Sequence, residues 1–413
     1  MGGFRRDMRA RFNGRPALRG FSVRACLLCA TVQRPLWEMK ILHCIPNLAG
    51  GGAERQLTYL ARVHVQAGVR THVAFLARGP NYSRLVESGA TLHESPVRGF
   101  YSPWPIIWLA AVVRRLRPDI IQTWILHMDV LGGLVARTFS LPWVLSERCS
   151  EALYPPSWKT TLRRWLGRGC SSVVANSVVG LNYWRPLVKA GTPLYTIPNI
   201  IPTDEIERSA PAHLPPRCAS DISDVVVSAG RFCAQKNFGT LVEALALLAR
   251  KKQFRGFIFG DGPDRNGIRD QIAIKGLSAT VAVPGYSEDL WCFMKRASVF
   301  VLVSRFEGRP NVLLEAAAAG CPLVVSRIPP HEELLPPDSC CFVEPENPAD
   351  ICRGLAECLD NREAATKRAA RARQLVAAWS PEAIGARYTQ VYADLTRPAW
   401  QRGRGPRPPG LRE

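Results

Sequence analysis

The sequence predicts an α/β protein built from two Rossmann-like domains, with parallel sheets that face a central cleft. Strand-like apolar runs alternate with helical patterns along most of the chain, and this alternation is typical of parallel βαβ units. The length of 413 residues exceeds what one hydrophobic core usually holds. A polar, proline-rich stretch near residues 206–223 then divides the chain. Ligands of such folds bind at the carboxyl ends of the strands.

The first domain is expected over residues 39–205, completed by a C-terminal helix at 380–396. Ser380 can cap this last helix, and Pro381 suits its first position. Six predicted strands define the domain: 41–45, 71–76, 119–123, 143–146, 172–175 and 195–197.

The second domain is expected over residues 224–379, after an interdomain linker at 206–223. A helix at 240–251 is among those that separate its strands. Five predicted strands define it: 225–229, 257–259, 280–283, 299–303 and 323–325.

The two ends of the chain are expected to lie outside these domains. Residues 1–38 form a basic, disordered extension in this interpretation, and Met39 begins the working domain and is a candidate translation start. Residues 397–413 are rich in Arg, Pro and Gly and form a second disordered tail.

The net charge of +20 is unevenly distributed. Residues 1–40 carry +7 and residues 41–200 carry +10, whereas residues 201–396 carry −1 and the tail carries +4. This asymmetry favours a first domain that faces anionic lipid or a lipid-diphosphate and a second domain that binds a small ligand. The sequence lacks aromatic RNA-binding motifs, helix-turn-helix patterns and zinc-ligand spacings, so we expect no nucleic-acid partner.

The cysteine pattern indicates a reducing, cytoplasmic location. The thirteen cysteines show no framework spacing, and Cys44, Cys170 and Cys321 lie in or beside apolar runs, where burial is expected. No apolar run reaches the 18 to 20 residues of a spanning helix. Residues 158–168 instead predict a basic helix with Trp158 and Trp165 seven apart. The helix either lies on a membrane surface, such as the inner face of the plasma membrane, or packs both tryptophans inward with its arginines solvated.

The most informative segment is the helix start between Glu307 and Glu315. Pro310 suits the first helical position, and Gly320 suits the stop. The N–H groups of Asn311, Val312 and Leu313 would then face an anion, because a helix N-terminus carries partial positive charge. The two carboxylates suit hydroxyl groups on either side of a phosphate. This pattern predicts a nucleotide-sugar site, and the alternative is a solvated helix start with two surface acids.

Other candidate site residues also follow predicted strands. Arg231 and Lys236 could hold a diphosphate and stabilise the charge that develops as it leaves, unless they are simply exposed loop cations. Gly260 and Gly262 form a tight turn that a base or ribose could approach, and an ordinary surface turn explains the pattern equally well. The remaining candidates are the glycine-rich helix start Gly51-Gly52 and His127, which faces the expected cleft, although a lone histidine is more often structural.

The chain resembles the retaining GT-B glycosyltransferases of family 4 (glycosyl transferases group 1) from Met39 to about Leu395. Several segments match that family: Gly51 to Glu54, Ser146-Glu147-Arg148, Ala175 to Ser177, Ile197 to Asn199, Gly230-Arg231 with Lys236-Asn237, Gly260 to Pro263, and Glu307 to Glu315. The resemblance implies a metal-independent enzyme without cofactors, whose first domain binds the acceptor and whose second binds the nucleotide-sugar donor.

The same resemblance implies roles for individual residues. Glu307 with Gly308 would contact the donor hexose, and Glu315 the ribose. Arg231 and Lys236 would bind the diphosphate, and His127 would lie near the reacting carbon. The chain departs from the family at Gln122 and Trp124, where histidines are frequent, and at Ile200, which replaces a glycine.

The predicted function is hexosyl transfer from a nucleotide-diphosphate sugar to an acceptor hydroxyl, with a glycan or a lipid-linked glycan as the acceptor. Polysaccharide, lipopolysaccharide and glycolipid biosynthesis are the corresponding processes. The alternatives are a nucleotide-sugar epimerase of the same architecture and a non-catalytic, basic RNA-associated protein.

Overall fold

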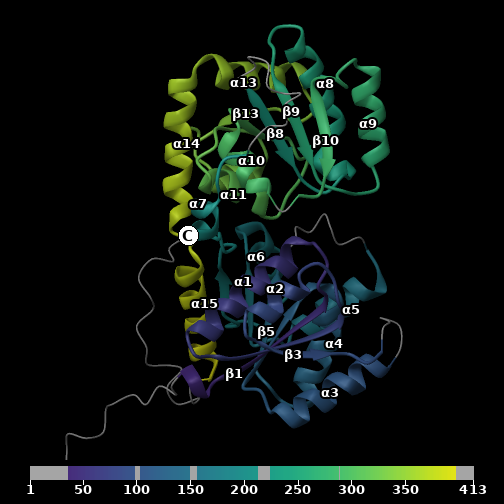
Figure 1. The fold of residues 1–413 in the computed structure, drawn as a ribbon. Helices are drawn as coiled ribbons and strands as arrows, with labels where there is room; N and C mark the ends of the chain where they lie inside the picture. The colour runs from purple at the N-terminus through teal and green to yellow at the C-terminus, as the bar shows by residue number, and fades with distance from the viewer. Residues whose placement is uncertain (1–35, 98–102, 149–155, 213–223, 288, 397–413) are drawn as a thin grey trace, which may run out of the picture. The chain divides into compact units, whose positions relative to one another are not determined.

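The computed structural model describes residues 36–97, 103–148, 156–212, 224–287 and 289–396 (Figure 1). It contains two parallel sheets, so the predicted α/β class with two Rossmann-like domains is confirmed. The expected terminal extensions lie outside the described residues, except at Leu36–Glu38, which form a short 3-10 helix instead of disordered chain.

The first lobe contains a seven-stranded parallel sheet with the order β3-β2-β1-β4-β5-β6-β7. Its strands are β1 (Lys40–Asn47), β2 (Arg70–Ala77), β3 (Thr91–Glu94), β4 (Ile120–Trp124), β5 (Trp143–Glu147), β6 (Ser172–Ala175) and β7 (Leu194–Thr196). Its helices are α1 (Gly52–Gln66), α2 (Tyr82–Glu87), α3 (Trp104–Leu116), α4 (Ile125–Thr138), α5 (Trp158–Gly167) and α6 (Val178–Trp184). Six strands match the predicted runs, whereas β3 was missed.

The second lobe contains a six-stranded parallel sheet with the order β10-β9-β8-β11-β12-β13. Its strands are β8 (Val225–Ala229), β9 (Arg255–Phe259), β10 (Val281–Gly285), β11 (Val299–Leu302), β12 (Leu323–Ser326) and β13 (Cys341–Val343). Its helices are α7 (Thr203–Arg208), α8 (Phe238–Ala249), α9 (Arg265–Ile274), α10 (Leu290–Arg296), α11 (Asn311–Ala318), α12 (Pro329–Leu334), α13 (Pro348–Asp360) and α14 (Arg362–Ala377).

Apolar side chains cover both faces of each sheet, as expected for parallel strands. Along β1, Ile41 and Leu42 point to opposite faces and join separate buried clusters. Along β8, Val226 and Val227 do the same in the second lobe. Cys44, Cys170 and Cys321 are buried, as predicted, and burial raises the pKa of the Cys170 thiol to about 12.

Both sheets reverse their strand order next to their first strand, and this reversal positions the candidate residues. In the first lobe, β1 and β4 lie side by side, and their carboxyl ends lead to Gly51 and to α4. In the second lobe, β8 and β11 lie side by side, and their carboxyl ends lead to Arg231 and Glu307. Such reversals open the crevice in which α/β folds bind ligands.

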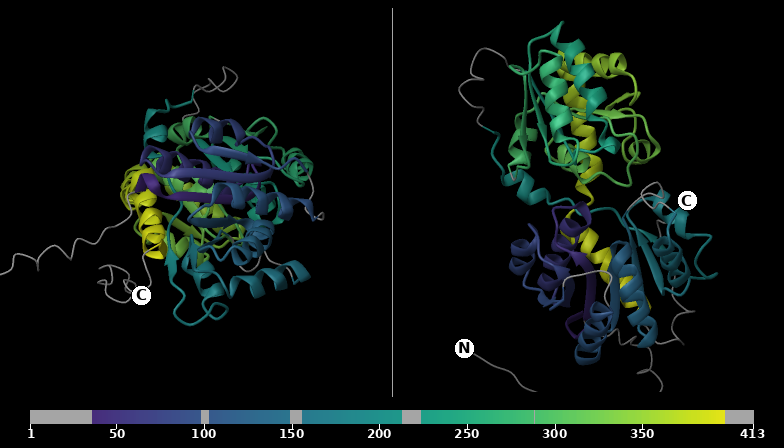
Figure 2. Two further views of the ribbon diagram at one scale, coloured as in Figure 1. Left: turned by 90° about the horizontal axis from the view of Figure 1, so that it is seen from below. Right: turned by 90° about the vertical axis from the view of Figure 1, so that its right-hand side faces the viewer.

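The last helix, α15 (Pro381–Thr396), packs against α1 of the first lobe, as the yellow ribbon in Figure 2 shows. Tyr388 and Tyr392 of α15 are buried in the same cluster as Leu57 and Leu60 of α1. Gly385 lies so close to Val63 that a Cβ atom there would lie 2.3 Å from the Val63 Cγ1 atom. The chain therefore returns to the first lobe after completing the second.

The described part of the segment predicted as a linker packs against the second lobe. Residues 206–208 belong to α7, and Ile206 is fully buried in the second lobe. Lys295 donates to the carbonyls of Glu207 and Ser209 at 2.7 and 2.6 Å. The first part of the expected linker is thus a packed helix, because Ile206 supplies an apolar anchor. Residues 213–223 lie outside the described part of the chain.

A glycine-dependent contact joins the loops after β8 and β9. Gly260 has φ of +138°, and a Cβ atom on it would lie 1.8 Å from the Gly230 carbonyl oxygen. Gly262 has φ of +156°, and a Cβ atom there would lie 2.3 Å from the Phe232 carbonyl oxygen. These glycines let a neighbouring protein loop approach closely, and the ligand contact suggested by the sequence stays a prediction.

We expect Gly260→Ala to destabilise the protein by about 3 kcal/mol, because the new Cβ atom combines backbone strain with a steric clash. The matched control is Gly267→Ala in α9, where no atom lies within 4 Å of the added Cβ. This control should be neutral or stabilising by about 0.5 to 1 kcal/mol. Urea unfolding of both variants measures the difference, and equal stabilities would contradict the argument.

Candidate functional site

The N-terminus of α11 lies at the carboxyl edge of the second sheet, as predicted. Pro310 is the N-cap of this helix, with φ of −74° and ψ of 109°, and Asn311 is its first residue. The predicted start was therefore one residue early. The N–H groups of Leu313 and Leu314 already donate to the Pro310 carbonyl, at 3.2 and 3.3 Å. The Pro310 carbonyl thus competes with an anion for the Leu313 N–H group, which was expected to bind the anion.

Glu307 is buried and held by three donors. The Ser304 hydroxyl donates to Glu307 Oε1 at 2.7 Å, and the Lys236 ammonium forms an ion pair with the same oxygen. The Gln235 amide approaches Oε2 at 3.3 Å. The structure brings together Lys236 and Glu307, two predicted site residues that lie 71 positions apart. The carboxylate is thereby fixed in a defined orientation, and its charge is balanced.

A second layer of polar groups supports Glu307, and sequence reasoning missed it. The Ser326 hydroxyl donates to the Ser304 carbonyl at 2.7 Å. The His331 Nδ1 atom lies 2.9 Å from the Ser326 carbonyl oxygen. Burial lowers the pKa of His331, which favours the neutral ring. Ser304 could have been noticed in the sequence because it precedes Glu307 by three residues, whereas Ser326 and His331 give no local signal.

Glu315 is also buried, and its partners were not predicted. The Arg55 guanidinium of α1 donates to Glu315 Oε1 at 2.6 Å, and the Trp291 indole donates to Oε2 at 2.7 Å. Arg55 belongs to the first lobe, so this ion pair joins the two lobes. Arg55 directly follows the glycine-rich segment, but no local pattern indicates a partner 260 residues away.

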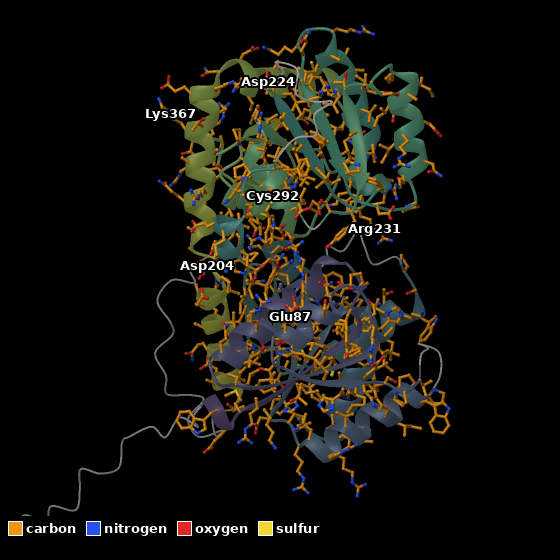
Figure 3. All side chains as sticks on the ribbon, viewed as in Figure 1. Glu87, Asp204, Asp224, Arg231, Cys292 and Lys367 are labelled. Atoms are coloured by element: carbon orange, nitrogen blue, oxygen red, sulfur yellow. The ribbon has the colours of Figure 1, made fainter. Side chains whose placement is uncertain are left out.

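Arg231 extends from the end of β8 and is exposed (Figure 3). Lys236 ends a short 3-10 helix, Ala234–Lys236, and Asn237 follows in a left-handed conformation with φ of 56°. Asn237 is the N-cap of α8, and its side chain accepts from the Thr240 hydroxyl at 2.7 Å and not from a backbone N–H. Arg231 and Lys236 therefore occupy the same loop at the carboxyl edge, where Arg231 is exposed and Lys236 is half-buried.

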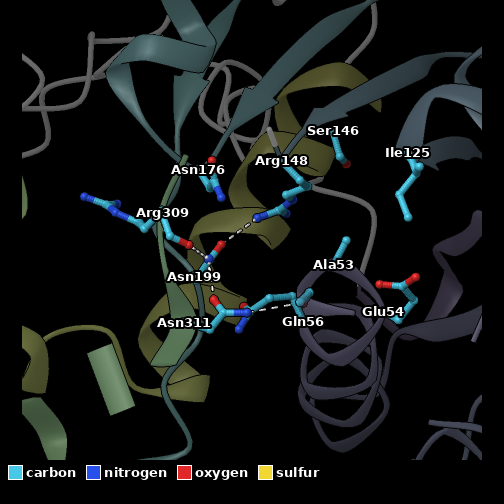
Figure 4. A pocket seen from close by; sticks show the side chains of 11 residues that line it. Ala53, Glu54, Gln56, Ile125, Ser146, Arg148, Asn176, Asn199, Arg309 and Asn311 are labelled. Atoms are coloured by element: carbon cyan, nitrogen blue, oxygen red, sulfur yellow. Dashed lines mark hydrogen bonds between the residues drawn. The ribbon is translucent and has the colours of Figure 1, made fainter. Parts of the chain in front are cut away.

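A pocket of about 260 Å³ lies between the two lobes (Figure 4). Its lining residues are Gly52, Ala53, Glu54, Gln56, Ile125, Ser146, Arg148, Asn176, Asn199, Arg309 and Asn311. The N-termini of α1 and α11 therefore contribute to the same pocket. Gly52 and Asn311 are so close that a Cβ atom on Gly52 would lie 2.8 Å from the Asn311 Nδ2 atom.

Asn199 connects the lobes on one side of this pocket. Its amide nitrogen donates to Asn311 Oδ1 at 2.5 Å, and its amide oxygen accepts from Arg148 at 3.1 Å (Figure 4). Next to it, Ile200 exchanges two hydrogen bonds with the Gln56 side chain, at 2.6 and 2.9 Å. Ile200 is not among the positive-φ residues, so the turn avoids the conformation that a glycine would permit.

Two departures from the family pattern lie beneath the pocket. The Trp124 ring supports the Arg148 guanidinium, with 4.5 Å between the guanidinium carbon and the ring centroid. Gln122 donates to the Ser146 hydroxyl at 2.7 Å and accepts from the Tyr392 hydroxyl. Both residues are fully buried. Sequence reasoning noted their unusual identity but could not place them below the pocket floor.

His127 lies in the first turn of α4 and is not among the residues that line the pocket. Burial lowers its pKa, and the nearby Lys159 lowers it further. Ile125 lines the pocket instead and has φ of 68°, which is rare for a β-branched residue. His127 is therefore near the cleft, but its predicted contact with the reacting sugar stays a prediction.

Of the two interpretations of the basic helix at 158–168, the one that packs both tryptophans inward with the arginines solvated is wrong, and the membrane-surface interpretation stays a prediction. Trp158 and Trp165 of α5 are 67% and 52% exposed, so they do not pack into the core. Arg163 is the buried residue instead. It donates to Asp129 at 2.7 Å and to Glu147 at 2.8 Å. The predicted core tryptophans are exposed, and one predicted surface arginine is internal, because two buried carboxylates require a cation.

Among the described residues, no helix is both long and apolar enough to cross a bilayer, and no three His, Cys, Asp or Glu side chains gather as metal ligands.

Known proteins share this fold and sequence pattern. The family models "Glycosyltransferase Family 4" and "Glycosyl transferases group 1" match residues 50–205 and 220–375. The lipopolysaccharide core biosynthesis glycosyltransferase LpsE of Rhizobium meliloti is 26% identical over 351 residues, or 83% of this chain and 96% of LpsE. The putative glycosyltransferase EpsF of Bacillus subtilis is 33% identical over 312 residues, or 70% of this chain and 79% of EpsF.

Solved structures agree in fold. HepE from Anabaena in complex with UDP-glucose has a TM-score of 0.75 at 18% identity, covering 86% of this chain and 99% of HepE. Sucrose-phosphate synthase from Thermosynechococcus elongatus has a TM-score of 0.74 at 18% identity, with the same coverage.

The two Rossmann-like lobes, with a pocket between them, have the GT-B fold, and with the family matches they identify the chain as a GT-B glycosyltransferase. The chain belongs to the glycosyl transferases group 1 family, whose members use a nucleotide sugar as co-substrate.

The buried Arg163 gives a prediction about the first lobe. Arg163→Met should destabilise the protein by about 3 to 5 kcal/mol, because Asp129 and Glu147 would remain buried without their cation. The control is Arg164→Met, next along α5 and exposed, which should change stability by less than about 0.5 kcal/mol. Urea unfolding measures both variants. A mild effect of Arg163→Met would show that the carboxylates are protonated or hydrated.

Proposed function

We propose that this protein is a retaining, metal-independent hexosyltransferase that moves a hexosyl group from a nucleotide-diphosphate sugar to an acceptor hydroxyl. The observation that carries the proposal is the pair of buried, oriented carboxylates, Glu307 and Glu315, on either side of the α11 N-terminus. Carboxylates accept hydrogen bonds from hydroxyl groups, and a helix N-terminus attracts phosphate.

Each part of the donor has a candidate partner. Glu307, with buried Gly308 beside it, would accept from hexose hydroxyls, and Glu315 from the ribose. Arg231 and Lys236 would bind the diphosphate. Backbone groups would contribute further donor contacts from three places: Gly51 and Gly52 in the first lobe, Asn311, Val312 and Leu313 in α11, and Gly260 and Gly262 beside the β8 loop.

The proposed reaction takes place on one face of the sugar. The bond between the anomeric carbon and the diphosphate oxygen breaks, and a bond from that carbon to the acceptor oxygen forms on the same face. The leaving phosphate takes the acceptor proton, so no protein base is required. Arg231, Lys236 and the α11 N-terminus would stabilise the charge on the leaving group in place of a metal ion.

The acceptor is proposed to be a glycan, with lipid-linked glycans as the leading class. The names of two relatives support this proposal, because LpsE and LpsD of Rhizobium meliloti are lipopolysaccharide core biosynthesis glycosyltransferases. The pocket between the lobes also suits a hydroxyl-rich acceptor, since Ser146, Asn176 and Asn199 in its lining supply donors and acceptors.

A peripheral contact with the inner face of the plasma membrane is the proposed location. The first lobe presents exposed Trp104 and Ile107 on α3 and exposed Trp158 and Trp165 on α5, and both helices pack against α4. Exposed arginines accompany them, at Arg114 and Arg115 on α3 and at Arg164 and Arg168 at the end of α5. Tryptophan and arginine on one surface suit an anionic lipid interface.

Substitutions at the donor site test the reaction. Glu307→Ala and Arg231→Ala should each lower turnover at least tenfold, an increase of about 1.4 kcal/mol in the barrier, because a donor contact or leaving-group charge stabilisation is lost. Transfer or donor hydrolysis is measured with UDP-, GDP- and ADP-hexoses. Glu363→Ala, an exposed acid on α14, is the control. Near-normal turnover in both site variants would refute the assignment, and NMR showing an inverted anomeric configuration in the product would refute the retaining mode.

The membrane proposal predicts co-sedimentation of the full chain with vesicles that contain phosphatidylglycerol, but not with pure phosphatidylcholine. Arg164→Ala with Arg168→Ala should weaken binding by about 2 kcal/mol, or roughly thirtyfold, because each arginine near an anionic surface contributes about 1 kcal/mol. Trp158→Ala with Trp165→Ala should also reduce binding. The control replaces Trp37 and Tyr286, which are equally exposed elsewhere. Binding that ignores lipid charge would contradict the proposal.

A further inference from the structure

The ion pair between Arg55 and Glu315 links the two lobes at the residue proposed to bind the ribose. Arg55 lies in the first turn of α1, and Glu315 lies in α11. The Arg55 Nη2 atom is 2.6 Å from Glu315 Oε1. The side chains are 23% and 5% exposed, so solvent screens this pair less than an ordinary surface pair.

Aromatic groups hold Arg55 in this position. Its Nε atom donates to the Tyr59 hydroxyl at 3.3 Å. Its guanidinium carbon lies 6.0 Å from the Tyr59 ring centroid and 5.7 Å from the Trp291 ring centroid. Trp291 itself donates to Glu315 Oε2 at 2.7 Å. Arg55 and Trp291 therefore hold each other as well as the carboxylate.

The number of acceptor sites on Glu315 decides what else it can bind. A carboxylate has two oxygens with about four acceptor sites in total. Arg55 uses one site on Oε1, and Trp291 uses one site on Oε2. One site on each oxygen remains, and this arrangement matches the two adjacent hydroxyl donors of a ribose. The carboxylate is thus oriented before the nucleotide arrives, which removes an ordering cost from binding.

We propose that Arg55 is a positioning residue for the donor: from the first lobe it orients Glu315 of the second lobe, so that recognition of the ribose hydroxyls depends on contact between the lobes. The inference rests on the proposed nucleotide-sugar site. Under this inference, nucleotide binding is coupled to the contact between the lobes. A nucleotide that binds more tightly when Glu315 is paired with Arg55 also favours the arrangement in which α1 approaches α11. By linkage, the coupling is reciprocal.

A competing account makes the opposite prediction. If Arg55 occupied the position of the ribose, the nucleotide would have to displace it, and removing Arg55 would strengthen nucleotide binding. Under our inference, removing Arg55 weakens nucleotide binding and reduces the preference for ribose over deoxyribose. The sign of the change therefore separates the two accounts.

The experiment measures the binding of UDP, GDP and ADP, and of their 2′-deoxy counterparts, to the full chain by calorimetry. The variants are Arg55→Met, which keeps the length without the charge, and Arg55→Lys, which keeps the charge. Arg62→Met is the matched control, because Arg62 lies on the same helix and forms an ion pair with Glu205 of α7 at 2.7 Å. Thermal unfolding without ligand establishes that each variant is folded.

We expect Arg55→Met to weaken binding of the preferred ribonucleotide about tenfold, or about 1.4 kcal/mol, and to bring its affinity close to that of the 2′-deoxy form. Arg55→Lys should restore part of both effects, and Arg62→Met should leave the ribose preference unchanged. In turnover assays, Arg55→Met should raise the donor KM more than it lowers kcat, which a general loss of stability would not do.

Three results would overturn the inference. Unchanged ribose preference in Arg55→Met would remove the positioning role, and tighter binding would establish competition instead. If the wild-type protein bound none of the three nucleotides, the proposed function and this inference would fail together. If the wild-type protein bound a nucleotide and Arg55→Met bound it equally well, only this inference would fail, and the proposed function would remain.

Discussion

The Lys236–Glu307 ion pair is the interaction on which the candidate site depends. A carboxylate next to a phosphate site is repelled by the ligand's charge unless nearby donors hold it. Lys236, Ser304 and Gln235 supply those donors, and they come from the loops after β8 and β11. These strands are neighbours in the second sheet, although 69 residues separate the end of β8 from the start of β11 in the chain. The parallel topology therefore creates the pairing, and the pairing balances the charge of the buried Glu307 close to the start of α11.

The pocket between the lobes is lined by two cationic side chains, Arg148 and Arg309, and one acidic side chain, Glu54. The N-termini of α1 and α11 both reach it, and each brings partial positive charge. Arg148 adds a full charge, supported by the Trp124 ring below it. Asn199 and Asn311 then connect the lobes through neutral amides, which can rearrange without separating charges. The pocket thus combines positively charged groups with neutral amide hydrogen bonds between the lobes that can rearrange.

The sequence was sufficient for the fold because its signals are local. Apolar runs marked the long buried strands, and Pro310 and Gly320 marked the two ends of α11 to within one residue. The short edge strands β3 and β13 were missed, since each has only three or four residues and β3 contains one large apolar side chain. The charge-paired Arg163 was predicted to be solvated because helix periodicity cannot show that Asp129 and Glu147 are buried beneath it.

The site was only partly predictable for a related reason. Glu307, Glu315 and Lys236 carry recognisable spacing, whereas their partners come from distant segments. Arg55 meets Glu315 across 260 residues, and Tyr388 meets Arg148 across 240. Such pairs leave no periodic or short-range pattern in one sequence. They emerge only once the order of the strands brings the loops together.

The return of α15 to the first lobe affects how the protein is made. The helix that covers α1 begins 315 residues after α1 ends. At about 5 to 20 residues per second, a ribosome needs roughly 15 to 60 s to synthesise the intervening chain. During that interval, the apolar surface of α1 around Leu57 and Leu60 lacks the Tyr388 and Tyr392 side chains that later cover it. The nascent first lobe therefore leaves this apolar surface without its final cover until the last helix emerges.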